Sequence, residues 1–375
     1  MTQRATAVPA NASGTRKTSP GWFKSAVFIL ACCVGGIALS PPIHARSIHD
    51  LNLDQPLPSF ITPVTTFGQR PDWSHDGKKI LFLEKTSGDV YEVEVATREL
   101  TPLTHDFVHE GFTRALYLAN GDILLSGARR FDRDNPHAHR HQDNAELWVL
   151  SPGAGKPPVA LGVNCREGPS VSRTQMKIAW ALYDDFWLAD IVYDAAGVPR
   201  LEGRKVVLTA DRLPAEGTWH IEAQNFRPGK EHELIFNMFD RDDNFLSETM
   251  GLDLRTGDIV NYSRRPDRYD EPEGIFPDGR RILVESSRHR HDYKDFRNFG
   301  PIDLYVLALN GSGDMVRLTF FNDDERFKAS QGVISDDGRF MAFQISRTAD
   351  TTGYGYGIML MDIEAYTRTY GIKLP

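Results

Sequence analysis

Hydrophobic and polar positions along the chain follow a pattern that repeats. Its clearest copy is the motif Trp-Ser-His-Asp-Gly at residues 73–77, followed by the apolar run at residues 80–82 and an alternating segment at residues 90–95. Alternation with a period of two residues is typical of a β-strand, and an Asp-Gly pair between two strands is typical of a tight hairpin turn. The pattern therefore predicts a small antiparallel sheet whose last strand ends near Leu103-Thr104.

Five further copies of this pattern follow, and the copy before residue 123 is the weakest. The apolar second strand of each copy is aligned on one residue, in order Ile80, Ile123, Ile178, Leu234, Ile282 and Met341. Successive copies are 43 to 59 residues apart, which suits a four-stranded propeller blade with loops of different lengths. We therefore expect an all-β fold, a six-bladed β-propeller with four-stranded antiparallel blades, over residues 57–375.

One strand-like segment precedes the first copy. Residues 60–66 resemble the last strand of a blade, although no blade comes before them. We expect this segment to pair with the C-terminal blade, around residues 356–363, and so to close the ring. Closure removes most of the open sheet edges that would otherwise favour aggregation.

The residues of the first copy also carry a family resemblance. The motif at residues 73–77, with Tyr91 and Leu103-Thr104, resembles the repeat of TolB-type periplasmic propellers, and residues 276–279, 302–305 and 318–319 repeat parts of it. The resemblance covers about residues 57–365 and implies the propeller fold. It implies no single activity, because such propellers include translocation partners, peptidase domains and oligogalacturonate lyases. The chain has no Gly-x-Ser-x-Gly motif of the peptidase branch.

The N-terminus reads as a signal for export. Residues 1–25 carry four basic residues and no acidic one, and the apolar run at residues 26–39 is followed by two prolines and by Ala45. The run is shorter than the about 20 residues that span a bilayer, so we expect a secretory signal peptide over residues 1–45, cleaved near Ala45. Residues 46–56 would then form a linker, and the mature protein would be periplasmic or secreted, without a membrane span. Lipidation at Cys32 is the alternative.

Composition narrows the classes of partner. The 375 residues include 43 Lys plus Arg and 51 Asp plus Glu, a formal charge of -8, which argues against nucleic acid as a ligand. After cleavage Cys165 would be the one cysteine left, so an internal disulfide cannot stabilise the fold. We expect a monomer that is stabilised by its core.

Carboxylates recur just before the predicted innermost strands. Glu167, Glu222 and Glu271 align with one another, and Glu110 is a fourth candidate. In a propeller these positions lie on the face that also carries the loops between second and third strands, here called the loop face. Converging carboxylates repel unless a cation, an arginine or raised pKa values relieve them. They are either a ligand site, together with Gln224, or caps of local backbone N–H groups.

Histidines and arginines concentrate in two loops expected on the same face. The candidates for ligand or metal binding are Arg288, His137, His139, His141, His289 and His291. A His-x-His spacing places two imidazoles on one side of an extended segment, which is half of a metal site. The alternative is a solvated polar loop without a ligand.

Two functions stay open from the sequence. The first is a non-enzymatic propeller that binds an envelope protein or an acidic oligosaccharide on its loop face. The second is a polysaccharide-lyase-like enzyme that uses a divalent metal ion, the one cofactor considered, on a uronate substrate. The resemblance to oligogalacturonate lyases, which pair histidine with a metal, implies the second. If the carboxylates form a site, Glu167→Gln or Glu222→Gln should weaken binding and stabilise the empty protein.

Overall fold

The structure is a computed structural model of the chain, and residues 44–375 form one compact unit. It describes residues 47–375 apart from residues 133, 142, 214–218, 242–244, 293–299 and 351–353. The predicted signal peptide and its cleavage point lie outside the described residues. Within those residues, no helix is both long and apolar enough to cross a membrane.

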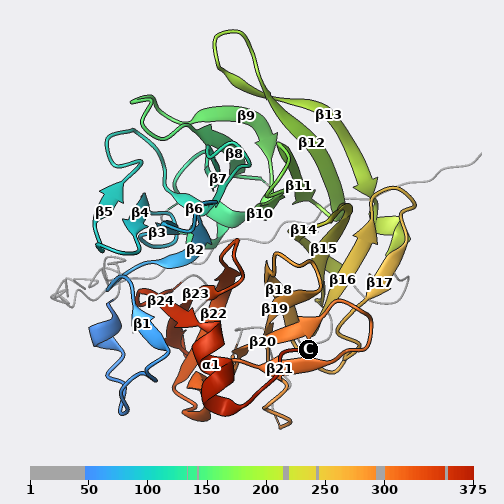
Figure 1. Cartoon of the computed structure of the whole chain (residues 1–375). Coiled ribbons are helices and arrows are strands. Elements are labelled where there is room, and N and C mark those ends of the chain that lie inside the picture. Colours follow the sequence, from blue (N-terminus) through green and yellow to red (C-terminus); the bar gives the residue numbers. More distant parts are fainter. Residues whose placement is uncertain are drawn as a thin grey trace, which may run out of the picture. The chain divides into compact units, whose positions relative to one another are not determined.

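Six four-stranded antiparallel sheets make up the fold (Figure 1). In the first three blades the strands follow one another in sequence order. Blade one comprises β2 (Gln69–Trp73), β3 (Lys79–Leu83), β4 (Val90–Glu94) and β5 (Leu100–Pro102). Blade two comprises β6 (Phe112–Tyr117), β7 (Ile123–Ala128), β8 (Ala145–Leu150) and β9 (Val159–Asn164). Blade three comprises β10 (Arg166–Val171), β11 (Lys177–Leu182), β12 (Asp185–Tyr193) and β13 (Pro199–Leu208).

The other three blades continue the series. Blade four comprises β14 (Trp219–Arg227), β15 (Lys230–Asp240), β16 (Ser247–Asp253) and β17 (Ile259–Asn261). Blade five comprises β18 (Asp270–Ile275), β19 (Arg281–Ser286), β20 (Asp303–Ala308) and β21 (Met315–Arg317). Blade six comprises β22 (Phe327–Ile334), β23 (Phe340–Arg347), β24 (Ile358–Asp362) and β1 (Ile61–Pro63). The first strands of neighbouring blades contact each other in a closed ring around a central channel, which confirms the six-bladed propeller.

The N-terminal strand closes the ring as predicted. β1 pairs antiparallel with β24, and Ile61 lies opposite Met361. Figure 1 shows the blue β1 beside the red β24. The two ends of the propeller chain therefore share one sheet, and β1 covers the outer edge of β24 as the fourth strand of blade six.

The residues of the repeat form the core and the hairpin turns. The six aligned apolar residues of the second strands are all fully buried between blades. In the Asp-Gly turns, Asp76 and Asp278 each accept a hydrogen bond from the backbone N–H two residues later. The following Gly77 and Gly279 have φ of +67° and +64°, which a residue with a Cβ adopts at a cost. These turns between first and second strands lie on the face opposite the loop face, here called the turn face.

One helix lies outside the repeat. The helix α1 (Ile363–Tyr370) follows β24 directly, and the side chain of Asp362 caps it by accepting from the N–H of Ala365. Short 3-10 segments are η1 (Ile48–Asp50), η2 (Pro136–Arg140), η3 (Ala210–Arg212) and η4 (Phe321–Asp323). Leu51, inside the predicted linker, is buried in the same core cluster as Tyr366.

Candidate functional site

Every innermost strand contains an irregularity that redirects a side chain. Each blade has a register shift against its second strand at a matching place, between Gln69 and Asp72, Phe112 and Arg114, Arg166 and Pro169, Ala223 and Asn225, Pro272 and Ile275, and Ser330 and Val333. Blade four has a second shift, between Phe226 and Arg227. A β-bulge of this kind bends the strand and re-aims the side chain at the extra residue. Six bulges at matching positions therefore direct a ring of side chains into the central channel.

Three residues at these bulges adopt a left-handed backbone conformation. Arg70, Glu167 and Gln331 have φ of 54°, 58° and 55°, which is uncommon for residues other than glycine. The pairing also changes the alignment made from the sequence. Glu222 and Glu271 are directly paired within their sheets, whereas Glu167 lies at the bulge. Glu167 therefore lies two positions further along its strand than Glu222 and Glu271 do along theirs. This difference could not be seen in the sequence, because a bulge leaves the local residue types unchanged.

At the loop-face end, an arginine meets the predicted carboxylates. Arg140, the last residue of η2 in the blade-two insertion, forms an ion pair with Glu167, and both side chains are 14% exposed. Arg140 also lines a cavity of about 40 Å³ together with Glu222 and Glu271. Burial lowers the pKa of Arg140, but the charges of Glu167, Glu222 and Glu271 outweigh burial and raise it. Three of the four predicted glutamates thus converge on one buried arginine.

The two paired glutamates differ in protonation. Burial would raise the pKa of Glu222, but the hydrogen bond from His220 and the charges of His220 and Arg140 outweigh it and hold the pKa below its ordinary value. His220 Nε2 and Glu222 Oε1 are 2.8 Å apart. Burial and the charge of Glu285 raise the pKa of Glu271 well above its ordinary value. The pKa values of the two glutamates are therefore shifted in opposite directions, which favours the ionised form of Glu222 and the protonated form of Glu271.

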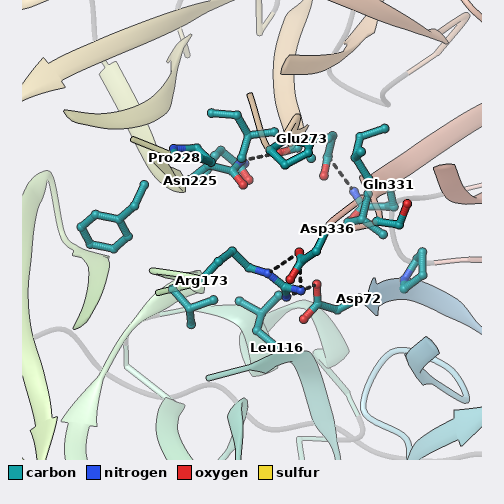
Figure 2. Close-up of a pocket in the computed structure, with 18 of the residues that line it drawn as sticks. Asp72, Leu116, Arg173, Asn225, Pro228, Glu273, Gln331 and Asp336 are labelled. Carbon is teal, nitrogen blue, oxygen red and sulfur yellow. Dashed lines mark hydrogen bonds and ion pairs between the residues drawn. The ribbon is translucent and has the colours of Figure 1, made fainter. Parts of the chain in front are cut away.

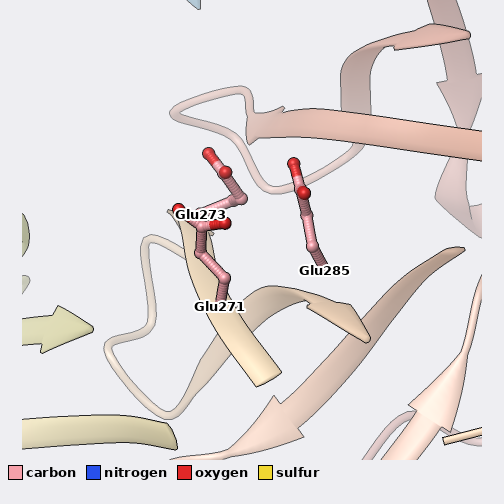
Figure 3. Close-up of side chains that lie close together, drawn as sticks. All are labelled: Glu271, Glu273 and Glu285. Carbon is pink, nitrogen blue, oxygen red and sulfur yellow. The ribbon is translucent and has the colours of Figure 1, made fainter. Parts of the chain in front are cut away.

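Glu271, Glu273 and Glu285 form a buried carboxylate triad (Figure 3). One carboxylate oxygen of each lies within 4.8 Å of the others. Burial, together with the charges of Glu285 and Glu271, raises the pKa of Glu273 well above its ordinary value, and Glu273 and Glu285 share a hydrogen bond. Gln331 Nε2 donates to Glu273 at 3.1 Å.

The triad offers the donor atoms of a metal site, but its surroundings are basic. Three carboxylates are the donors that Mg²⁺, Ca²⁺ or Mn²⁺ prefer. However, four basic side chains line the adjoining cavity with Glu271 and Glu285, namely Arg70, Arg114, Arg140 and Lys328. The raised pKa values of the three carboxyls favour their protonated forms, which repel one another less. The surroundings therefore do not fit a divalent cation, although the donor atoms do.

Two of the candidate histidines, His139 and His289, are held by hydrogen bonds to other residues of the protein. His139 is fully buried, with Nδ1 2.6 Å from Ser87 Oγ and Nε2 accepting from the N–H of Asp132 at 2.7 Å. His289 Nδ1 is 3.1 Å from Tyr305 Oη, and its Nε2 is 2.9 Å from Asn322 Oδ1. Burial lowers the pKa of His289 to about 4, so this imidazole is neutral.

The other predicted residues are dispersed. His291 Nδ1 lies 3.4 Å from Arg268 Nη2, His141 is exposed after η2, and the side chain of His137 lies outside the described residues. Glu110 is exposed, and its charge acts on His139. Arg288 binds both carboxylate oxygens of the fully buried Asp270, at 2.8 and 3.1 Å. In the described part of the chain, the carboxylate triad is the one group of three or more potential metal ligands, and it contains no histidine.

The channel widens at its other end into a funnel of about 300 Å³ that opens on the turn face (Figure 2). Gln224, predicted for the loop face, lines this funnel, as do Arg70, Arg114 and Gln331. These last three also line the 40 Å³ cavity, so they separate the two spaces. Arg173 of blade three crosses the funnel to Asp336 of blade six, at 2.8 Å, and lies 3.6 Å from Asp72.

Sequence reasoning missed most of the channel residues. Those the structure adds are Arg70, Arg114, Arg140, Arg173, Glu273, Glu285 and Gln331. The sequence offered one clue to three of them. Arg70, Glu273 and Gln331 each lie within three residues of the positions, just before the innermost strands, at which the carboxylates were aligned. Glu285 and Arg114 follow apolar or small residues inside strands, and nothing in the sequence marks them as facing the channel.

Comparisons with known proteins find distant structural similarities alone. No family model matches the chain, and no curated protein sequence matches it. An oligogalacturonate lyase solved in complex with manganese shares 15% identity, with 80% of this chain and 77% of that chain covered and a TM-score of 0.47. An oligogalacturonate lyase from Vibrio parahaemolyticus shares 13% identity, with 80% and 79% covered and a TM-score of 0.48.

TolB from Acinetobacter baumannii shares 14% identity, with 76% of this chain and 65% of that chain covered and a TM-score of 0.41. The chain is a six-bladed β-propeller distantly similar to both kinds of protein. At these identities the likeness concerns the fold alone. Function has to be argued from the channel and its two faces.

Proposed function

We propose that the chain is an exported, non-enzymatic binding propeller, which recognises a protein partner or an acidic glycan of the cell envelope with its loop face. The observation that carries this proposal is that the charged and polar side chains at the loop-face end of the channel are already paired within the protein. Arg140 pairs with Glu167, the imidazoles of His139 and His289 are hydrogen-bonded within the protein, and the cavity there measures about 40 Å³. Small-molecule sites usually measure about 300–1,000 Å³, so a sugar ring cannot enter this end.

Recognition on this face therefore uses the surface around the channel mouth. Arg129 is 57% exposed, Asp184 is 38% exposed and Arg241 is 33% exposed as side chains. All three stand in connections between second and third strands, so they share the loop face. Exposed charges of both signs set the orientation and the rate of association of a protein partner more than they set its affinity. This surface suits an envelope protein better than a uniformly acidic glycan.

A charge-reversal experiment tests the binding surface. The double variant Arg129→Glu with Arg241→Glu is compared with Arg255→Glu, which reverses a 65% exposed arginine on a turn-face hairpin. Envelope extract from the native host is passed over each immobilised protein, and retained proteins and glycans are identified. We expect a partner retained by the wild type and by Arg255→Glu, and lost with the double variant. Equal retention by all three proteins would contradict a loop-face site.

Export is tested by the N-terminus of the protein isolated from the native host. The basic and apolar segments of residues 1–45 support cleavage near Ala45. Mass spectrometry should then find Arg46 or a close neighbour as the first residue. An intact Met1 on cytosolic material would contradict export.

A metal-assisted uronate lyase is the second candidate. The three donor oxygens of the carboxylate triad favour it, whereas the basic side chains around the adjoining cavity oppose it. The lyase requires a bound divalent ion and a new absorbance from the unsaturated product when uronate oligomers are added. Elemental analysis of the purified protein, followed by that absorbance assay with and without a chelator, separates the two functions. The binding proposal expects no tightly bound metal and no turnover. If uronate oligomers are turned over, and both a chelator and Glu273→Gln abolish the turnover, the lyase replaces the binding proposal.

A further inference from the structure

Two arginines at the floor of the turn-face funnel have no carboxylate partner. Arg70 Nη1 and Arg114 Nη1 both donate to Gln331 Oε1, at 3.2 and 3.0 Å. Neither guanidinium forms an ion pair with a carboxylate anywhere in the described residues, whereas Arg140 and Arg173, in the same channel, do so. Each guanidinium has five N–H donors, and Gln331 is the one side-chain acceptor that the described chain offers them.

The charge of Arg70 is buried without full compensation. Arg70 is buried, with 5% of its surface exposed. Burial, with the like charges of Arg114 and Arg140, lowers the pKa of Arg70 to about 9. The charges of Glu167 and Glu273 act in the opposite direction on this pKa, but they do not outweigh burial and the two arginines. A buried charge is costly unless it is paired, and an anion at this point would pair it.

Above the arginines the funnel has apolar walls. Residues from blades two to six contribute them, namely Leu116, Val171, Phe226, Pro228, Pro277 and Ile334. Such walls stabilise a hydrocarbon body by burying it, and they offer few partners for the hydroxyl groups of a sugar. The volume of about 300 Å³ lies at the small end of the range for ligand pockets. The funnel therefore combines a cationic floor with hydrophobic sides, and Figure 2 shows Leu116 and Pro228 around the space that Arg173 crosses.

We infer that the turn-face funnel binds a carboxylate carried on a compact apolar body, with the carboxylate on Arg70 and Arg114 and the apolar body against the blade walls. Guanidinium groups bind carboxylates through paired, charge-assisted hydrogen bonds, and two adjoining arginines can share the two oxygens. The carboxylate can belong to a small fatty-acid-like molecule or to the C-terminus of an apolar peptide. This site lies on the face opposite the proposed partner surface and does not depend on it.

Calorimetric titration of the protein purified from cells that express the full chain tests this site. Four probes are compared: octanoate, its neutral analogue octanamide, the polar carboxylate glucuronate, and N-acetyl-leucyl-leucine as a model peptide terminus. We expect octanoate or the dipeptide to bind with a Kd of about 1 mM or lower. Octanamide and glucuronate should bind at least about ten-fold more weakly, because one lacks the charge and the other lacks the apolar body. The tighter of octanoate and the dipeptide identifies the source of the carboxylate.

Variants assign the binding to the funnel. Arg114→Gln should weaken binding of the carboxylate at least about ten-fold, since it removes one charge-assisted contact. Arg339→Gln, on the turn face but paired with Asp362 outside the funnel, should leave binding unchanged. If Arg114→Gln does not fold, Leu116→Glu and Leu116→Gln replace it, and the acidic variant should bind the carboxylate more weakly than the neutral one. Equal binding of octanoate and octanamide, no binding of any probe, or equal binding by wild type and the funnel variants would overturn the proposal.

Discussion

The two ends of the central channel use the same kinds of residue in opposite ways. At the loop-face end, Arg140 is surrounded by Glu167, Glu222 and Glu271, and the remaining cavity is about 40 Å³. At the turn-face end, Arg70 and Arg114 share one neutral glutamine, and the funnel measures about 300 Å³. Oppositely charged side chains pack together at the loop-face end. At the turn-face end, two arginines without a carboxylate ion pair adjoin an open space that an anion can fill.

The difference has a local origin. Arg140 arrives on a loop insertion of blade two, so it can approach three blades at once. Arg70 and Arg114 stand on the strands of blades one and two, and their backbone positions are fixed by pairing with the second strands. The backbone of a loop can adjust until a cationic side chain reaches its carboxylate partners, whereas the backbone of a paired strand cannot.

The largest expected effect comes from removing the loop-face cation. Arg140→Met removes the ion-pair partner of Glu167 and one of the two positive charges beside Glu222, and loss of one partner from a buried ion pair costs about 3–5 kcal/mol. We expect a loss of this size in the free energy of unfolding at pH 7, measured by urea denaturation. Arg129→Met, which removes an exposed pair with Glu146, should cost less than about 1 kcal/mol. Equal losses in the free energy of unfolding for the two substitutions would show that Arg140 does not stabilise the buried carboxylates Glu167 and Glu222.

A smaller effect of opposite sign is expected within the triad. Glu273→Gln keeps a hydrogen-bonding group but removes a carboxyl whose pKa is raised by burial and by Glu285 and Glu271. Because the folded pKa lies above the ordinary value of 4.5, the folded wild type keeps a proton that the unfolded chain releases, and its stability falls as the pH rises above 4.5. The variant lacks this loss, so it should be more stable by about 1–2 kcal/mol at pH 8 and nearly equal at pH 4.5.

Glu222→Gln is the matched comparison for that substitution. The pKa of Glu222 is lowered, against burial, by His220 and Arg140, so its ionised form stabilises the folded state above the ordinary pKa and the benefit is lost in acid. We expect a loss of stability at pH 7, opposite to the expectation from the sequence alone, which treated the carboxylates as mutually repelling. Thermal unfolding at pH 5 and pH 8 measures both variants. A gain in stability for Glu222→Gln would restore the repulsion hypothesis.

The smallest effect is expected at the rim of the turn face. His75 Nδ1 lies 3.1 Å from Asp336 Oδ2, and this hydrogen bond raises the pKa of His75, with Arg173 acting against it. A raised histidine pKa stabilises the fold below the ordinary value of 6.5 and loses that effect as the pH rises through the folded pKa. His75→Gln should therefore cost less than about 1 kcal/mol at pH 5.5 and still less at pH 8.5. An effect that grows with pH in thermal unfolding would contradict the assignment.

The fold was largely predictable because its signals are local. The Asp-Gly turns and the alternating strands act within about ten residues, so six copies could be counted. The pairing of the N-terminal strand with the last blade followed from one unmatched strand, whereas its register, with Ile61 opposite Met361, came from the structure. The helix α1 was not predicted, because its eight residues pack against Phe60 and the last blade only after the ring has closed.

The sequence by itself determined the six blades, the closing strand and the convergence of acidic positions near the channel. Only the tertiary structure decided which charges meet. A bulge moves Glu167 out of line with Glu222 and Glu271, an insertion carries Arg140 rather than its histidines into the channel, and Arg70 and Arg114 face each other from separate blades. Strand formation depends on neighbours along the chain, whereas the energy of a buried charge depends on distances between blades that no local pattern encodes.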